Sequence, residues 1–394
     1  MGLGHVRRHL AIASALVESS PSAKILLATS VDEAAQLGLP PRVETLKLPG
    51  LRKVANNRYT SSRLGLAASE ICALRSALLL EAVKVFKPVV VLVDKHPFGA
   101  GGELGPALDA VKASGARAVL GLRDILDSPA AVLKEWSPRG FPERVNDYYE
   151  LILVYGLDSI FDPILHYQFS DALAERTRFC GYVVNHSSSH GRLDAACCPA
   201  NPRSGPRPTV LATTGGGEDG FTLLRTFIEA AGGVAWKGVA VAGPKLSQEE
   251  LQTLQRLAIE SDVTLHTFLP CLYGLLQTVD GLVCMGGYNT LLEAASQGVP
   301  TVCVPRTSPR SEQLLRSQAF ESLGLLRTIH PDHLTVGQLQ QEVALTLQLP
   351  RKQLRERAHN ALDFGGAGRA ANYLLDLVRN DQRTKATRLE RVAW

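Results

Sequence analysis

The N-terminal residues of this chain could supply a catalytic base. The sequence opens with Gly2-Leu3-Gly4-His5 and continues with the mixed polarity of a helix. A histidine at a helix N-terminus has a lowered pKa because the helix dipole disfavours its cation, so it can accept a proton near neutral pH. His5 is therefore a candidate general base for a hydroxyl nucleophile, and a capping or packing role is the alternative. A metal pair with His9 is not favoured, since no carboxylate or cysteine completes the ligand set.

The stretch 284–306, CMGGYNTLLEAASQGVPTVCVPR, could bind a diphosphate. It combines an apolar strand, a Gly-Gly turn, an amphipathic helix and a second apolar strand. Gly286 and Gly287 would let backbone amides approach a ligand closely. Asn289 or Thr290 is placed to cap the helix, whose N-terminus attracts anions. An ordinary βαβ unit is the alternative, but the combined spacing favours a nucleotide-diphosphate site.

Two further features belong to the same candidate site. Glu293 lies one turn into the helix, where a carboxylate is better placed to accept hydrogen bonds from a sugar diol than to meet a phosphate. The run Gly215-Gly216-Gly217 follows another apolar strand and would present a concave row of amides to a diphosphate. A plain flexible turn explains this glycine run equally well.

Polar residues at other strand ends could bind the rest of a nucleotide sugar. Phe268 and Leu269 end an expected strand, whose backbone could pair with a nucleobase edge. Arg306 follows the expected strand at 300–305, and Glu312 and Gln313 offer acceptors and donors for sugar hydroxyls. A capping turn of the following helix explains Glu312 and Gln313 equally well.

Charged residues also gather at two strand ends in the first half of the chain. Asp94 and Lys95 follow one apolar run, and Arg123 and Asp124 follow the next. We assign these four residues to the side of an acceptor substrate, with a structural ion pair as an equal alternative.

The composition indicates a globular protein in a reducing compartment. The chain has 394 residues, 45% of them apolar and 20% charged, which suits two domains with full cores. A net charge of +4 without a basic run excludes a nucleic-acid footprint. The seven cysteines form no CxxC pair, and no signal peptide or transmembrane span is evident. We therefore expect a cytoplasmic protein.

Apolar strands alternate with helices along the chain, which predicts an α/β protein with two doubly wound, Rossmann-like domains facing a cleft. The expected domains are 1–190 and 208–380, joined by a linker at 191–207 and followed by a basic tail at 381–394. No strand precedes the first glycine turn, although a doubly wound sheet has its central strand there. We expect a missing first strand and a truncated or misplaced start. The expected strands are 24–29, 43–48, 89–94, 116–122, 151–156, 209–214, 238–243, 263–268, 281–286 and 300–305.

The GLGHVRR start, the GGG loop and GGYNTLLEAASQGVPTVCVPR followed by EQ resemble glycosyltransferases of the GT-B fold. The closest branch is the one that includes the bacterial peptidoglycan UDP-N-acetylglucosamine transferase. The resemblance implies that His5 is the acceptor base, with Gly2 and Gly4 beside it. It also implies that Glu293 holds the ribose and that the glycine turns hold the diphosphate. The positions matching the donor-sugar and base contacts are Glu312, Gln313, Phe268 and Leu269.

The resemblance implies transfer of a hexose or N-acetylhexosamine from a nucleotide diphosphate sugar to an acceptor hydroxyl, with inversion. A UDP-sugar is the favoured donor, and the acceptor is lipid- or glycan-linked or another hydroxyl compound. The chain has no DxD triplet, so we expect neither a metal nor another cofactor. An epimerase of the same fold and a non-catalytic nucleotide-sugar binding protein are the alternatives. Peripheral membrane contact through Leu64, Leu66 and 78–80 is less favoured than helix packing.

Overall fold

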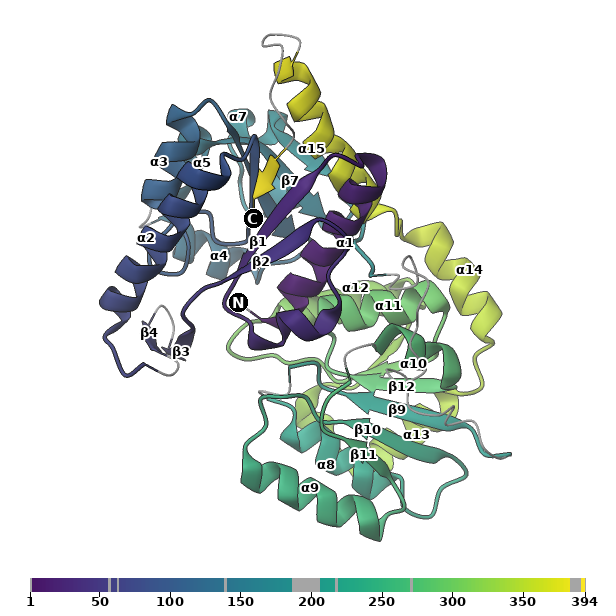
Figure 1. Ribbon diagram of the computed structural model, residues 1–394. Helices are drawn as coiled ribbons and strands as arrows, with labels where there is room; N and C mark the ends of the chain where they lie inside the picture. Colours follow the sequence, from purple (N-terminus) through teal and green to yellow (C-terminus); the bar gives the residue numbers. More distant parts are fainter. Residues whose placement is uncertain are drawn as a thin grey trace. The chain divides into compact units, whose positions relative to one another are not determined.

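The computed structural model describes residues 2–55, 58–61, 64–137, 140–185, 206–216, 219–269, 272–382 and 391–393 (Figure 1). The chain divides into two compact units, Met1–Val183 with Gly365–Trp394, and Val184–Phe364. The predicted domain boundary at residue 380 is therefore wrong, because the segment after Phe364 packs with the first unit. The predicted linker lies outside the described residues except at 206 and 207.

The described part of the first unit contains a seven-stranded sheet with the order β2-β1-β15-β5-β6-β7-β8, in which all strand pairs are parallel. Helix α1 packs against α15, and α2 packs against α3 (Figure 1). The strands are β1 (Lys24–Thr29), β2 (Val43–Lys47), β5 (Val90–Asp94), β6 (Arg117–Arg123), β7 (Tyr149–Tyr155), β8 (Thr177–Phe179) and β15 (Arg391–Ala393), with β3 (Leu51–Ala55) and β4 (Arg58–Ser61) as a separate antiparallel pair. The helices are α1 (Leu3–Ser19), η1 (Asp32–Leu37), α2 (Ala68–Phe86), α3 (Gly105–Ala113), α4 (Pro129–Trp136), α5 (Phe141–Tyr148), α6 (Pro163–His166), α7 (Asp171–Glu175) and α15 (Gly366–Gln382).

An interior position of this sheet, between β1 and β5, is occupied by the last of the described strands, β15. β15 pairs in parallel with β1 on one side and with β5 on the other. As predicted, the described chain begins with helix α1 rather than with a strand. The prediction of a basic tail at 381–394 is corrected at its two ends, because α15 continues to Gln382 and Arg391–Ala393 lies in the sheet. The facing edges of β1 and β5 need backbone hydrogen-bond partners, and β15 supplies them over part of their length.

The second unit has the strand order β11-β10-β9-β12-β13-β14 in its described residues, and all pairs are parallel. In chain order this is 3-2-1-4-5-6, the doubly wound arrangement whose ligand site lies where the order reverses, here between β9 and β12. The strands are β9 (Thr209–Thr213), β10 (Lys237–Val241), β11 (Thr264–His266), β12 (Gly281–Cys284), β13 (Thr301–Cys303) and β14 (Arg327–Thr328). The helices are α8 (Phe221–Ala230), α9 (Gln248–Glu260), α10 (Leu272–Thr278), α11 (Tyr288–Gln297), α12 (Glu312–Ser322), η3 (Pro331–His333), α13 (Val336–Thr346) and α14 (Arg351–Ala361).

Local sequence signals explain several of these elements. Every residue of β5 and of β9 is buried, as expected for strands covered by helices on both faces. Ser247 caps α9, because its hydroxyl accepts the amide of Glu250 while the Glu250 carboxylate accepts the amide of Ser247. Helix α11 ends at Gly298, which has a φ of 66° and adopts the left-handed conformation that glycine tolerates best.

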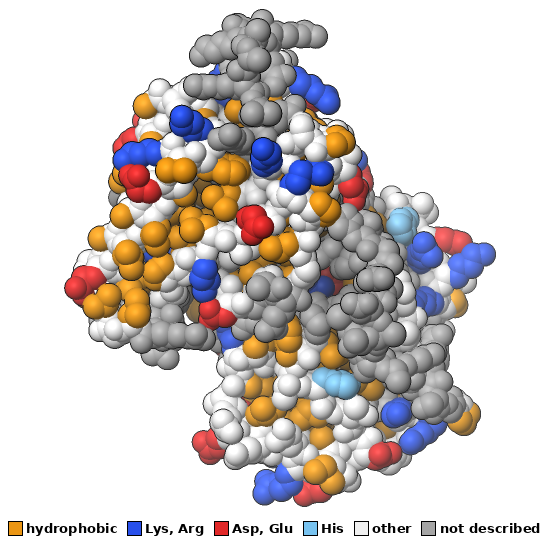
Figure 2. Space-filling model, in the orientation of Figure 1, with side chains coloured by type: hydrophobic (Ala, Val, Ile, Leu, Met, Phe, Trp, Pro, Cys, Tyr) orange, Lys and Arg blue, Asp and Glu red, His pale blue; other side chains and the backbone are white. Residues whose placement is uncertain are grey.

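Apolar side chains remain exposed around α2. Hydrophobic atoms gather on the face of the first unit that carries this helix (Figure 2). Leu64 and Leu66 are 60% and 40% exposed, whereas Leu79 is buried in a core cluster. Helix packing therefore explains Leu79 but not Leu64 and Leu66. Among the helices in the described ranges, none is long and apolar enough to cross a membrane.

Replacing Gly298 by valine is expected to lower the free energy of unfolding by about 1–3 kcal/mol. A β-carbon at this position would lie 2.4 Å from the carbonyl oxygen of Arg351, and the φ of 66° disfavours any L side chain. Chemical denaturation of the purified protein measures the effect. The control is Gly337→Ala in α13, where a β-carbon meets no atom within 4 Å and stability should stay equal or rise. Equal unfolding midpoints for the Gly298 variant and the wild type would contradict this account.

Candidate functional site

The carboxylate of Asp94 binds three side chains from the start of α1. Its Oδ2 atom lies 2.5 Å from Nδ1 of His5, 2.6 Å from Nη2 of Arg8 and 3.1 Å from Nε2 of His9. Asp94 ends the buried strand β5, and the side chain of His5 is 17% exposed. The guanidinium of Arg8 also lies over the ring of Tyr155, 5.1 Å from its centre. Because His5 uses Nδ1 toward Asp94, its Nε2 atom is the nitrogen available to accept a proton.

This environment holds His5 neutral and Asp94 charged. Burial lowers the pKa of His5 to about 3, although the adjacent carboxylate acts in the opposite direction. The predicted lowering is confirmed, but burial is the main cause instead of the helix terminus. Burial alone would raise the pKa of Asp94, yet Arg8, His5 and His9 hold it well below its usual range. A neutral imidazole beside an ionised carboxylate has the protonation states that a general base requires.

The other predicted acceptor-side residues lie at the start of α1 and at the ends of β5 and β6. Gly2 is the N-cap of α1, and Gly4 lies in its first turn. Lys95 has a φ of 68° and donates its amide hydrogen to Gly121. The charge of Arg123, at the end of β6, contributes to lowering the pKa of His5. Asp124 is 1% exposed, which excludes it from direct contact with a ligand in this conformation.

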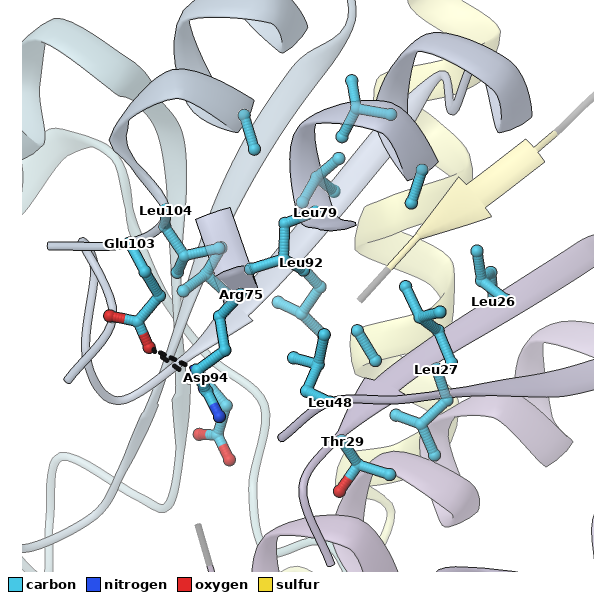
Figure 3. A pocket seen from close by; sticks show the side chains of 18 of the residues that line it. Leu26, Leu27, Thr29, Leu48, Arg75, Leu79, Leu92, Asp94, Glu103 and Leu104 are labelled. Atoms are coloured by element: carbon cyan, nitrogen blue, oxygen red, sulfur yellow. Dashed lines mark hydrogen bonds and ion pairs between the residues drawn. The ribbon is translucent and has the colours of Figure 1, made fainter. Parts of the chain in front are cut away.

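A largely apolar pocket adjoins His5 and Asp94 (Figure 3). It is lined by consecutive residues of β1 and of β5, from 26 to 29 and from 91 to 94. β15 pairs only with 24–26 of β1 and with 90 and 91 of β5. Residues of α2 and α3, among them Leu79, Val83 and Leu108, complete the lining, so the pocket lies between the sheet and these two helices. Arg75 and Glu103, which also line the pocket, form a buried ion pair of 3.0 Å (Figure 3).

In the second unit, the Gly286-Gly287 turn joins β12 to α11 at the reversal of strand order. Gly286 has a φ of 81°, a positive value that glycine adopts readily because it has no side chain. Gly287 is the N-cap, which corrects the prediction that Asn289 or Thr290 caps the helix. Asn289 and Thr290 instead belong to the first turn of α11, because the helix begins at Tyr288. The amides of that first turn have no partners within the helix and can bind an anion.

The remaining donor-side predictions fall at neighbouring strand ends. Gly215 and Gly216 follow β9, with φ of 67° at Gly215, while Gly217 lies outside the described residues. Phe268 and Leu269 follow β11 and are half-buried. Glu293 is 1% exposed within α11, so it must gain access to a ribose through movement of its surroundings or of its own side chain.

Arg306 connects three of the predicted segments. Its guanidinium lies 3.0 Å from Oδ2 of Asp219 in the glycine-loop segment and 2.9 Å from Oε1 of Glu312. Its backbone amide donates to Oε1 of Gln313 at 3.0 Å. Glu312 and Gln313 are the first residues of α12. Ser311 is the N-cap residue of that helix, but its side chain makes no capping hydrogen bond. The structure thus brings Arg306, Glu312 and Gln313 together, as the donor-site prediction requires.

Arg8, Asp219 and Arg316 are site residues that the sequence motifs did not predict. Arg8 stands three residues after His5, a helical spacing that places both side chains on one face and could have signalled the contact. No local pattern links Asp219 to Arg306, 87 residues away. Within the described residues, no group of three or more His, Cys, Asp or Glu side chains could hold a metal ion.

Comparison with known proteins gives a family match for part of the chain. Residues 216–373 match the glycosyltransferase family 28 C-terminal domain. The chain is 25% identical over 219 residues to the NDP-glycosyltransferase YjiC of Bacillus licheniformis. That alignment covers 55% of this chain and 52% of YjiC, so the chain matches about half the length of this curated relative.

Solved structures share the fold over nearly the whole chain. A UDP-glucose:anthocyanidin 3-O-glucosyltransferase in complex with UDP superimposes with a TM-score of 0.62, 12% identity, and coverage of 96% of this chain and 97% of the other. MurG of Acinetobacter baumannii gives a TM-score of 0.54, 15% identity and coverage of 96% of both chains. The chain therefore has the two Rossmann-like units of the GT-B fold, as predicted. The similarity does not single out the peptidoglycan branch, since the score with MurG is the lower of the two.

Replacing His5 by glutamine is expected to weaken the pH dependence of stability. Because the folded protein lowers the pKa of His5 from 6.5 to about 3, only the unfolded chain binds this proton between those values. Stability therefore falls as the pH decreases through that window, and the depressed pKa of Asp94 adds a loss in more acidic solution. Urea unfolding between pH 7 and 4 should show a slope smaller by up to about 1.4 kcal/mol per pH unit in the variant. Equal slopes would show that His5 is not buried as a neutral group.

Proposed function

We propose that this protein is a glycosyltransferase. It transfers a hexose or N-acetylhexosamine from a nucleotide diphosphate sugar, with UDP as the favoured nucleotide, to an acceptor hydroxyl. The observation that carries the proposal is the position of the Gly286-Gly287 turn and the α11 N-terminus, where the strand order of the second sheet reverses. The match of residues 216–373 to a glycosyltransferase domain supports it.

The second unit holds the donor in this proposal. The diphosphate lies at the first turn of α11, where backbone amides and the helix dipole favour negative charge. Glu293 accepts the ribose hydroxyls, and the strand end at Phe268 and Leu269 binds the base. Glu312 and Gln313 contact the donor sugar, which requires Glu312 to exchange part of its contact with Arg306 for sugar hydroxyls.

The first unit supplies the base that activates the acceptor. His5 Nε2 takes the proton of the acceptor hydroxyl while Nδ1–H donates to Asp94. The acceptor oxygen then forms its bond to the anomeric carbon, and the bond from that carbon to the diphosphate oxygen breaks with inversion. The electron pair leaves with the nucleoside diphosphate, whose charge the amides of α11 stabilise. Arg8 and His9 are positioning residues, because they hold the carboxylate that orients His5.

His5→Ala is expected to reduce kcat by about 10²–10⁴, the usual contribution of a general base. The dissociation constant for UDP should stay within about twofold, because the diphosphate residues belong to the other unit. The assay follows UDP release from UDP-glucose or UDP-N-acetylglucosamine in the presence of hydroxyl acceptors, and calorimetry measures UDP binding. Wild-type kcat/KM should show no loss from protonation of His5 until the pH approaches about 3, the pKa in the free protein. Unchanged turnover in the variant would remove His5 from the mechanism.

A thermal-shift screen with UDP-, GDP- and dTDP-sugars tests the proposal as a whole. A donor that binds only the folded protein raises its unfolding temperature. Incubation of the bound sugar nucleotide, isotopically labelled, with and without an acceptor then identifies the reaction. A glycosylated acceptor supports transfer, whereas an epimerised sugar nucleotide formed without acceptor contradicts it. Binding with neither transfer nor hydrolysis across the acceptor panel would also contradict an enzymatic role.

A further inference from the structure

Helix α12 contains a completely buried arginine. The side chain of Arg316 is 0% exposed and is the largest of the fully buried side chains among the described residues. Transfer of a guanidinium into the protein interior costs several kcal/mol unless nearby groups compensate for the lost water. A hydrophobic residue of similar size would fill the same volume without that cost, so the charge itself requires an explanation.

The contacts of Arg316 converge on the turn that begins α11. Its Nη1 atom donates a hydrogen bond of 3.4 Å to the carbonyl oxygen of Gly286. The guanidinium carbon lies 5.5 Å from the centre of the Tyr288 ring. The charge of Arg316 also lowers the pKa of Cys303 at the end of β13, against the larger opposing effect of burial. These three neighbours surround the start of α11.

The close packing of this turn leaves little freedom for another arrangement. A β-carbon on Gly286 would lie 3.0 Å from the sulfur of Cys303 and 3.4 Å from the carbonyl oxygen of Gln313. The turn therefore lies directly on β13 and on the first turn of α12. A single buried side chain that binds the Gly286 carbonyl can set the direction of the peptide that follows.

Peptide geometry converts this hydrogen bond into a direction for the next amide. The carbonyl of Gly286 and the N–H of Gly287 belong to one planar trans peptide, in which the two groups point in opposite directions. Because the carbonyl points toward buried Arg316, the N–H of Gly287 points away from it. The hydrogen bond thereby fixes the direction of the Gly287 amide, which belongs to the N-cap of α11, the helix end that attracts anions.

We propose that Arg316 is a positioning residue for the donor diphosphate. It fixes the orientation of the Gly286–Gly287 peptide, and its buried positive charge favours the anion bound at the α11 N-terminus. This inference rests on the proposed donor site and adds a cation that acts from beneath the turn. Arginine suits this role because it stays charged when buried and its planar fork can bind a carbonyl and lie over an aromatic ring together.

The test compares binding of uridine, UMP and UDP by Arg316→Met, Arg316→Lys and the wild type in calorimetry. We expect Arg316→Met to lose about tenfold or more in affinity for UDP, the scale of a lost charge-assisted contact, while uridine affinity changes less than about twofold. Arg316→Lys should lose less, because it keeps the charge but not the fork. The ratio of UDP to uridine affinity is the readout, since general damage to the unit would weaken both ligands.

Arg351→Met is the matched control. Arg351 donates to the carbonyls of Leu276, Val279 and Gln297, so it binds backbone at the opposite end of α11. Its loss should reduce stability but leave the ratio of UDP to uridine affinity unchanged. An equal ratio in Arg316→Met and wild type overturns the inference. If Arg316→Met does not fold, Arg316→Lys provides the test. A reduced ratio of UDP to uridine affinity in that variant supports the inference, and an unchanged ratio overturns it. Failure of the wild type to bind UDP, GDP or dTDP would instead overturn the proposed function.

Discussion

All strand pairs in the two main sheets are parallel, and this constraint decides where polar chemistry can occur. Helices cover both faces of such sheets, so strands like β5 and β9 are wholly buried and polar groups are confined to the strand ends. Asp94 ends β5, and the glycine turns follow β9 and β12. The strand order of the second sheet then places the glycine turn after β9 next to the glycine turn after β12, because these two strands are neighbours despite their separation in sequence.

In each unit a buried charged side chain binds the start of a helix, Asp94 in the first unit and Arg316 in the second, and these two charges have opposite sign. Asp94 binds the first turns of α1, while Arg316 binds the turn that begins α11. Breaking a buried ion pair such as Asp94–Arg8 by removing one partner costs about 3–5 kcal/mol, so this contact holds the start of α1 on the end of β5. Arg316 likewise connects α12 to the turn that begins α11. Rigid placement of this kind suits a base that must remain neutral and a set of amides that must receive an anion without rearrangement.

The sequence predicted the regular elements well where the signal is local. The strand at 24–29 has the predicted bounds, and a helix follows the Gly286-Gly287 turn as predicted, because apolar periodicity and glycine punctuation act within a few residues. The prediction failed for 391–393, which reads as part of a basic tail and yet forms an interior strand of a sheet, between β1 and β5. Three residues carry too little periodicity to predict a strand. Their structure depends on the open position between β1 and β5, which the segment itself does not encode.

The candidate site likewise has features that depend on local sequence and features that depend on tertiary contacts. By itself the sequence determined the glycine turns, the helix that follows them and the candidate base His5, since each depends on residue type and short spacing. Only the tertiary structure decided that His5 meets Asp94 across 89 residues, that Arg306 bridges to Asp219 across 87, and that Arg316 reaches the carbonyl of Gly286. Such contacts depend on which strands are neighbours and where each strand ends. That arrangement is a property of the packed chain, because backbone pairing and burial must be satisfied for all segments together.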